Sequence, residues 1–289
     1  MAFTAKDVSE LRARTGAGMM DCKKALEESN GNMDEAVDSL RKKGIAKAEK
    51  RTGRSTSEGA VVADIAADGA SGALVEINCE TDFVARNEGF QAIAKAVAAQ
   101  ARQAPAGADL AAVMASKMDG GSDVETFVRE SSAKLGEAVN VRRVARFDAG
   151  KGVVGSYVHF NGKIGVLVEL IADNGDRSEE LTTLARTIAE HVAAANPLGL
   201  DKDSVPADVV ERERAIFVDQ VKASGKPEAM IDKIVSGKID AYYRDVALMH
   251  QAWVREPKQS IQQIVDAAGK KVGGKVTVKR FARFQLGQE

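Results

Sequence analysis

The 289-residue sequence has little of the chemistry on which most catalytic and metal centres depend. It contains three histidines, one tryptophan and two cysteines, and aromatic residues make up 4% of the chain. Cys22 and Cys79 are too few for a disulfide framework and too far apart for a zinc spacing, so they fit a reducing cytoplasm. No phosphate-binding glycine loop, paired-histidine motif or nucleophile elbow is found. We therefore expect no metal, no cofactor and no enzymatic activity.

Other absences bear on location and partners. No stretch approaches the roughly 18 apolar residues of a membrane span, and residues 1–10 lack the apolar segment of a secretory signal. We expect a cytoplasmic protein without a membrane partner. The chain has 41 Lys and Arg against 42 Asp and Glu, a net charge of −1. This balance argues against a protein built mainly to neutralise nucleic-acid phosphates.

The beginning of the chain, up to about residue 45, predicts three short helices. Thr4 and Asp7 form an imperfect capping box for the first helix, and Asn32 is suited to cap the third. Gly44 stands where a helix C-terminus is expected. The second helix has an apolar stripe formed by Met19, Cys22, Ala25 and Leu26. Because three helices of about ten residues make a small core, such a module usually presents one face to a partner.

A basic stretch between Arg41 and Arg54 follows, opposed locally by Glu49 alone. It is interpreted as a solvated helix end followed by a linker. The alternative is a nucleic-acid contact. No aromatic side chains alternate with the charges, so a surface for base stacking is not indicated.

The rest of the sequence contains an internal repeat of two copies. The runs 59–62 and 74–77 match 152–155 and 167–170 at an offset of 93 residues, and helical positions 90–97 match 181–188 at an offset of 91. Later the run 141–147 matches 278–284 at an offset of 137. The offset grows by 44 residues, which predicts an insertion between Asn196 and Glu256.

Each half predicts a β-hairpin, two helices and a final strand. The fold class is therefore α+β: a small three-helix N-terminal domain, then a duplicated α+β core. Pro206 begins a helical pattern, and the turn 225–227 separates it from a second one, so the insertion predicts an antiparallel helical hairpin. The expected boundaries are 1–55 for the N-terminal domain with its basic linker, 56–148 and 149–289 for the two core subdomains, and about 203–250 for the hairpin.

One segment, residues 80–86, is present in the first half of the repeat alone. It contains Asp82 and Phe83 in or beside a loop, between a strand that ends near Cys79 and a helix that begins around Glu88. Composition favours Phe83 as a buried core residue. The alternative is a wedge, an apolar ring inserted into a partner. The matching segment, 173–176, is an ordinary polar turn, and this difference makes 80–86 a candidate for function rather than fold.

Three motifs together resemble one protein family, bacterial elongation factor Ts. The first is Leu11-Arg-Ala-Arg-Thr-Gly-Ala-Gly-Met-Met-Asp-Cys-Lys-Lys-Ala-Leu26, and the second is Asn78-Cys-Glu-Thr-Asp-Phe-Val-Ala-Arg86. The third is the hairpin formed by Gly155–His159 and Ile164–Val168. The resemblance covers essentially the whole chain. It implies a ubiquitin-associated-like (UBA-like) N-terminal domain, a two-subdomain core and an inserted helical hairpin.

The same resemblance implies an activity in translation elongation: guanine-nucleotide exchange on elongation factor Tu, which releases GDP so that GTP can bind. No bond in a substrate is made or broken, so this is not an enzyme. The residues that match the family's magnesium-dislocation motif are Thr81, Asp82, Phe83 and Val84. Phe83 is expected to enter between two helices of the GTPase, accompanied by Asp82, and so disturb its magnesium and phosphate sites.

Further contacts are implied by the same comparison. Arg12, Met19 and Met20 match N-terminal contacts to the GTPase domain, where flexible thioethers adapt to a partner. His159 matches a hairpin position near a distal domain of the partner. The loop after it, 160–162, departs from the glycine-rich loops common in the family. The inserted hairpin is a candidate surface for the partner or for a second copy of the chain.

Two other functions compete with this one. The first is a nucleic-acid-binding translation protein that acts through Arg41–Arg54, and it predicts salt-sensitive RNA binding by residues 1–56. The second is an enzyme that uses Cys79 or His159, and it predicts a reactive thiol of low pKa or a pH-dependent turnover.

Overall fold

The computed structural model describes residues 3–49, 51 and 53–288. The chain divides into two compact units. In the described part of the chain, no helix is long and apolar enough to cross a membrane. The first unit combines Met1–Val62, Val75–Val144 and Gln285–Glu289, and the second combines Ala63–Leu74 and Ala145–Phe284.

The first unit begins with three helices, as predicted. They are α1 (Ala5–Thr15), α2 (Met19–Glu28) and α3 (Met33–Glu49). The capping box at Thr4 is complete, because its side chain accepts from the Asp7 backbone while the Asp7 carboxylate accepts from the Thr4 backbone. Asn32 Oδ1 accepts from the backbone N–H of Glu35 at the start of α3. The helices enclose a small core of Val8, Leu11, Cys22, Ala25, Leu26 and Ala36.

The predicted end of the third helix at Gly44 is wrong, because α3 continues to Glu49. The glycine has a packing role instead. A Cβ atom at Gly44 would lie 3.2 Å from the Cβ of Ala133, on a later helix of the same unit. The absence of a side chain therefore allows the two helices to approach closely, and nothing in the neighbouring residues indicates that distant contact.

The first half of the repeat forms a three-stranded sheet in the order β1-β2-β3. Its helices and strands are β1 (Glu58–Ile65), β2 (Ser71–Cys79), α4 (Asp82–Ala85), α5 (Glu88–Gln103), α6 (Leu110–Ala115), α7 (Val124–Leu135) and β3 (Val139–Asp148). The short helices α4 and α6 were not expected from the sequence. Helix α5 buries Phe90, Val97 and three alanines on its apolar face.

The second half forms a sheet in the order β4-β5-β8, in which β4 pairs antiparallel with β5. Its elements are β4 (Gly152–Val158), β5 (Ile164–Ala172), α8 (Glu179–Ala195), α9 (Ala207–Ala223), α10 (Glu228–Val246), the 3₁₀ turn η1 (Leu248–His250), β6 (Ala252–Trp253), β7 (Glu256–Ser260), α11 (Ile261–Val272) and β8 (Val276–Gln285). The small β6–β7 ribbon was not predicted. The core of this half lies between the sheet, α8 and α11.

The elements of the two halves correspond at the offsets found in the sequence. Strands β2 and β5 begin and end 93 residues apart, and α5 and α8 begin 91 residues apart. Helices α7 and α11, like strands β3 and β8, begin and end 137 residues apart. Equivalent helices also end on equivalent glycines, Gly136 and Gly273, both in the left-handed conformation.

A buried glutamate pairs with a partly exposed arginine at the same place in each half. Glu76 on β2 receives a hydrogen bond of 2.7 Å from Arg143 Nε on β3, and the Glu76 side chain is fully buried. At the equivalent positions Glu169 receives a bond of 2.5 Å from Arg280 Nε, and it is also fully buried. Because a buried carboxylate is costly without a partner, each pair specifies which strands lie side by side.

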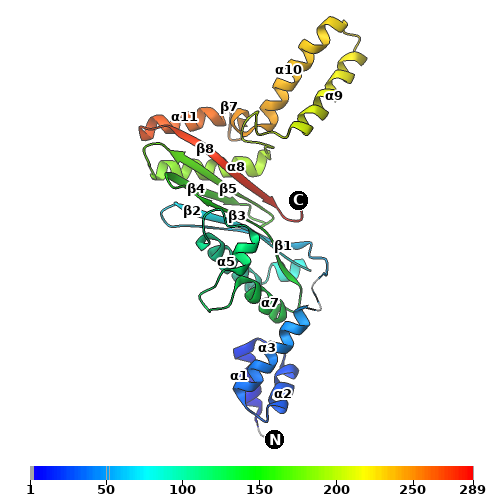
Figure 1. Ribbon diagram of the computed structural model, residues 1–289, viewed down its shortest axis with the longest axis vertical. Coiled ribbons are helices and arrows are strands. Elements are labelled where there is room, and N and C mark those ends of the chain that lie inside the picture. The colour runs from blue at the N-terminus through cyan, green and yellow to red at the C-terminus, as the bar shows by residue number, and fades with distance from the viewer. Residues whose placement is uncertain (1–2, 50, 52, 289) are drawn as a thin grey trace. The chain divides into compact units, whose positions relative to one another are not determined.

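The insertion consists of α9 and α10, which lie side by side in Figure 1 and are joined by the turn at Gly225. Each helix begins after a proline, Pro206 and Pro227. The pair has its own small apolar seam, formed by Val221, Ile231, Val235 and Ile239.

Candidate functional site

The segment that distinguishes the first half from the second forms a single helical turn that exposes a phenylalanine. Strand β2 ends at Cys79, and α4 begins after two intervening residues, at Asp82. Thr81 caps the turn, because its Oγ1 accepts a hydrogen bond of 3.3 Å from the Val84 backbone. Ala85 faces inward and is buried, while 84% of Phe83 is exposed. The interpretation of Phe83 as a core residue is therefore wrong.

The exposure of Phe83 has a simple geometric cause. A helix of four residues has one inward position, and the small Ala85 occupies it. Phe83, two residues earlier, points to the opposite side of the turn. Asp82 and Val84 are half-buried beside it. An exposed aromatic ring gains nothing from folding of the free chain, and its burial against a partner would contribute about 2–3 kcal/mol.

The turn is held by one carboxylate from a distant part of the sequence. Glu137, in the connection between α7 and β3, accepts hydrogen bonds from the backbone N–H groups of Glu80 and Thr81 at 3.1 and 3.0 Å. It also accepts a bond of 2.6 Å from the Thr81 hydroxyl. The residues just before Phe83 are therefore fixed by three hydrogen bonds to a charged acceptor, the stronger class of hydrogen bond.

A second carboxylate connects the same two segments in the opposite direction. Glu80 accepts a hydrogen bond of 2.8 Å from the Ala138 backbone and forms an ion pair of 3.2 Å with Arg54. These donors hold the pKa of Glu80 below its ordinary value, with the Ala138 bond as the largest cause. On the exposed side of the turn, the Asp82 carboxylate lies 3.1 Å from Arg86.

The N-terminal residues predicted to contact a partner all lie on the surface. Arg12 is exposed near the end of α1, and Met19 and Met20, at the start of α2, are 46% and 73% exposed. The expectation that Met19 belongs to the apolar stripe of α2 is therefore not met, whereas the other three members of that stripe are buried. Arg12 and the two methionines flank the turn at residues 16–18.

His159 lies in the second unit, at the end of the β4–β5 hairpin. Its Nδ1 is 2.9 Å from the Tyr157 hydroxyl, and its ring is 4.5 Å from the ring of Phe160. Phe160 is 92% exposed, and the sequence argument did not select it.

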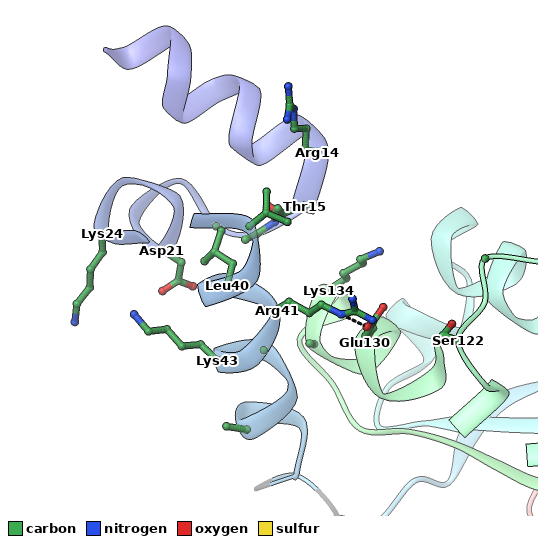
Figure 2. Close-up of a pocket in the computed structure, with 18 of the residues that line it drawn as sticks. Arg14, Thr15, Asp21, Lys24, Leu40, Arg41, Lys43, Ser122, Glu130 and Lys134 are labelled. Atoms are coloured by element: carbon green, nitrogen blue, oxygen red, sulfur yellow. Dashed lines mark hydrogen bonds and ion pairs between the residues drawn. The ribbon is translucent and has the colours of Figure 1, made fainter. Parts of the chain in front are cut away.

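A cleft of about 1060 Å³ lies within the first unit, between the turn at residues 16–18, α3 and α7. Figure 2 shows the Arg41 side chain reaching across to Glu130, and their ion pair measures 2.6 Å. Lys43 also lines the cleft and pairs with Glu28. We assign the cleft to the contact between α3 and α7 and give it no ligand.

Four described residues of the basic stretch make contacts within the protein, although the side chains of Arg41, Lys43 and Arg54 stay about half exposed, and Lys50 lies outside the described residues. Besides the pairs of Arg41 and Lys43, Arg51 donates to the Ser132 carbonyl at 3.2 Å and Arg54 pairs with Glu80. These contacts give four of the basic residues a packing role within the first unit.

The cysteines and histidines do not form a catalytic or metal centre in the described part of the chain. No group of three or more potential metal ligands occurs among those residues. Burial raises the pKa of the Cys79 thiol to about 12, and the charge of Glu137 adds to this. His191 is buried between Gln251 and the Val254 backbone, and burial lowers its pKa. Such groups suit packing, not nucleophilic attack.

Comparison with known proteins gives the family directly. The pattern of the family "Elongation factor TS" matches residues 80–288. The chain belongs to the elongation factor Ts family. Similar curated proteins, all named elongation factor Ts, include that of Trichlorobacter lovleyi, 46% identical over 100% of this chain and 94% of the relative. That of Clostridium acetobutylicum is 43% identical over 99% and 93%, and that of Prosthecochloris aestuarii is 42% identical over 99% and 99%.

Family membership makes the chain an elongation factor of protein synthesis. The structure places Thr81 to Val84 in one turn, and Arg12, Met19 and Met20 around another, both in the first unit. Sequence reasoning missed Glu137. It lies 56 residues from Thr81, and a lone glutamate after Gly136 gives no local sign of its distant hydrogen-bond donors.

Proposed function

We propose that the chain is a guanine-nucleotide exchange factor that binds elongation factor Tu in its GDP-bound state and promotes release of GDP. Family membership supports the assignment. The observation that carries the mechanism is the 84% exposure of Phe83 on a turn whose backbone is fixed by Glu137. A large apolar side chain exposed on a turn whose backbone is fixed by hydrogen bonds is the expected form of a group that enters a partner.

The mechanism is a linkage between two binding equilibria. Phe83 enters between two helices of the GTPase with Asp82 beside it, while Thr81 and Val84 form the turn that carries them. The displacement disturbs the sites that hold the magnesium ion and the GDP phosphates. If the chain binds the nucleotide-free GTPase more tightly than the GDP-bound form by some factor, GDP affinity must fall by the same factor. No covalent bond changes, so the activity is not enzymatic.

Other surfaces add affinity without taking part in the displacement. Arg12, Met19 and Met20 bind the GTPase domain through the N-terminal face, which their exposure favours. His159 and the hairpin end around it contact a distal domain of the partner. In this proposal residues 1–55 are a UBA-like domain, 56–148 and 149–289 are the two core subdomains, and the helical hairpin is inserted at about 203–250.

Self-association through the helical hairpin is a further proposal. Ile216 on α9 and Met230 on α10 are 42% and 48% exposed, so the hairpin has apolar side chains available to a second copy. Light scattering of the purified chain is expected to give a dimer mass that falls to the monomer mass in the double variant Ile216→Glu/Met230→Glu. A monomer mass for the unmodified chain contradicts this proposal and leaves the exchange activity untouched.

The exchange function is tested by the release of a fluorescent GDP analogue from elongation factor Tu. The unmodified chain is expected to accelerate release, and Asp82→Ala and Phe83→Ala are expected to lose most of the acceleration. Val254→Ala is the control, because it removes a 48% exposed apolar side chain far in sequence from the turn. Unchanged release with the unmodified chain overturns the function. Equal acceleration by the unmodified chain and all variants overturns the role of the turn and leaves the exchange function standing.

A further inference from the structure

We propose that Glu137 is a positioning residue for nucleotide exchange: it holds the Phe83 turn in the conformation that enters the partner. This inference rests on the proposed function above. Glu137 belongs to neither of the motifs that identify the turn or the N-terminal face. It lies in the connection between α7 and β3, and it touches the turn through the Glu80 and Thr81 backbones and the Thr81 hydroxyl.

Comparison of the two halves of the internal repeat distinguishes contacts that belong to the shared fold from contacts that hold the Phe83 turn. In the first half, the Glu80 carboxylate accepts from the Ala138 backbone at 2.8 Å. In the second half, at the equivalent positions, the Asp173 carboxylate accepts from the Lys275 backbone, also at 2.8 Å. This bond joins the end of a central strand to the start of the last strand in both halves. It is therefore part of the common fold.

The second half makes the corresponding contacts without a carboxylate: the Asp173 N–H donates to the Lys275 carbonyl at 3.1 Å, and Asn174 Nδ2 donates to the Val272 carbonyl at 2.9 Å. The position equivalent to Glu137 is Gly274, and a Cβ atom there would lie only 2.6 Å from Asp173 Oδ1 and 2.7 Å from Asn174 Cγ. The second half thus folds with no side chain at this position. A glutamate with three acceptor contacts occurs in the half that carries the exposed phenylalanine, whereas Gly274 shows that the second half forms without a carboxylate at this position.

The connection that carries Glu137 is itself held in place. The Ser132 hydroxyl, on the last turn of α7, donates a hydrogen bond of 2.5 Å to the Glu137 carbonyl. The carboxylate is therefore presented from a fixed backbone to the two N–H groups that precede α4. Fixing those groups reduces the number of conformations that Phe83 must give up when it enters a partner, which is the usual benefit of preorganisation.

The decisive test is a double-mutant cycle on GDP release from elongation factor Tu. Glu137→Ala is expected to slow stimulated release about tenfold, the effect of losing hydrogen bonds to one charged acceptor. In the Phe83→Ala background, Glu137→Ala is expected to change release by less than about twofold, because no ring is left to position. Glu190→Gln is the matched control. It alters a half-buried carboxylate that pairs with Arg186 in the second unit, and it is expected to leave release unchanged.

A second measurement tests, in the absence of the partner, whether Glu137 holds the backbone of the turn. Hydrogen exchange of the Glu80 and Thr81 amides is expected to be faster in Glu137→Ala than in the unmodified chain and in Glu190→Gln. Glu137→Gln retains one acceptor oxygen. Its GDP-release rate and its amide exchange rate are expected to lie between those of Glu137→Ala and those of the unmodified chain.

The experiments distinguish failure of the inference about Glu137 from failure of the proposed exchange function. If the unmodified chain does not accelerate GDP release, the proposed function fails, and the hydrogen-exchange result alone decides whether Glu137 positions the turn. If release is accelerated but Glu137→Ala is as active as the unmodified chain, the inference is overturned. Equal fold losses with and without Phe83 also overturn it, because they indicate a general loss of folded protein.

Discussion

At the scale of single residues, the chemistry of the chain depends on partners that are distant in sequence. Cys79 ends an apolar strand, and its thiol donates a hydrogen bond of 3.2 Å to the Thr81 carbonyl. Burial and then the negative charge of Glu137 raise its pKa to about 12, from an ordinary value of 9.0. The thiol is therefore protonated at neutral pH and acts as a small apolar side chain.

A first prediction concerns the reactivity of this thiol. In the variant Cys22→Ala, which leaves Cys79 alone, a disulfide reagent at pH 8 is expected to label the native protein at least about a hundredfold more slowly than the denatured protein, because the thiolate is the reactive form. Absorbance of the released thiolate measures both rates. Labelling of the native protein at the rate of the denatured one would refute the buried, protonated state.

The same pKa shift predicts how stability depends on alkaline pH. Below about pH 9 the thiol is protonated in both the folded and the unfolded chain. Between about pH 9 and pH 12 the unfolded thiol ionises while the folded one remains protonated, so the free energy of unfolding falls as pH rises. The slope from this group approaches about 1.4 kcal/mol per pH unit. Urea unfolding of Cys79→Ala should give a smaller alkaline slope, and an identical slope would contradict the shift.

Local residue patterns predicted the N-terminal caps of two helices well, and the C-terminal cap at Gly44 and the environment of Phe83 badly. Thr4 and Asn32 act on backbone groups two or three positions away, so the sequence contains both members of each contact. The exposure of Phe83 depends on which side of a four-residue helix faces the core, and its support comes from Glu137. Neither can be derived from neighbouring residues.

At the scale of secondary-structure elements, helix α3 shows how packing overrides a local signal. Glycine is usually a helix-ending residue, yet α3 passes through Gly44 and packs on α7 at that point. The Arg41–Glu130 ion pair, shown in Figure 2, joins the same two helices. The residue that makes glycine useful here, Ala133, lies 89 positions later in the chain.

Two helical glycines therefore respond differently to alanine. A Cβ atom at Gly237, in α10, would have no neighbouring atom within 4 Å, so Gly237→Ala is expected to raise the free energy of unfolding by about 0.5–1 kcal/mol through helix propensity. Gly44→Ala is expected to gain less, because its methyl group meets Ala133 at 3.2 Å. Urea unfolding measures both, and equal gains would contradict the close α3–α7 contact.

At the scale of the whole molecule, the internal repeat was the most informative feature of the sequence. The offsets of 93, 91 and 137 residues reappear in the bounds of the matched strands and helices. A repeat can be recognised from the sequence because its matched apolar positions can be compared without knowing which residues are in contact in the fold. The division into two compact units could not be predicted from the sequence, since each unit combines segments from separate parts of the chain.

The repeat predicts matched responses at two equivalent glycines. Gly59 and Gly152 have φ values of +144° and +126°, and a Cβ atom at either would lie 2.1 Å from a carbonyl oxygen of the neighbouring strand. Each substitution by alanine is expected to lower the free energy of unfolding by more than about 3 kcal/mol, because the backbone must move. Thermal unfolding compares them with Gly162→Ala, in an open turn, which should cost about 1 kcal/mol. Tolerance of alanine at either position contradicts the equivalence.

The central claim is that the chain lowers GDP affinity by preferring the nucleotide-free GTPase, and that Phe83 supplies this preference. Calorimetric titration of the chain into elongation factor Tu, once GDP-bound and once nucleotide-free, measures the preference directly. We predict much tighter binding of the nucleotide-free form, with most of the difference lost in Phe83→Ala. Equal affinity of the unmodified chain for the two forms would contradict the claim.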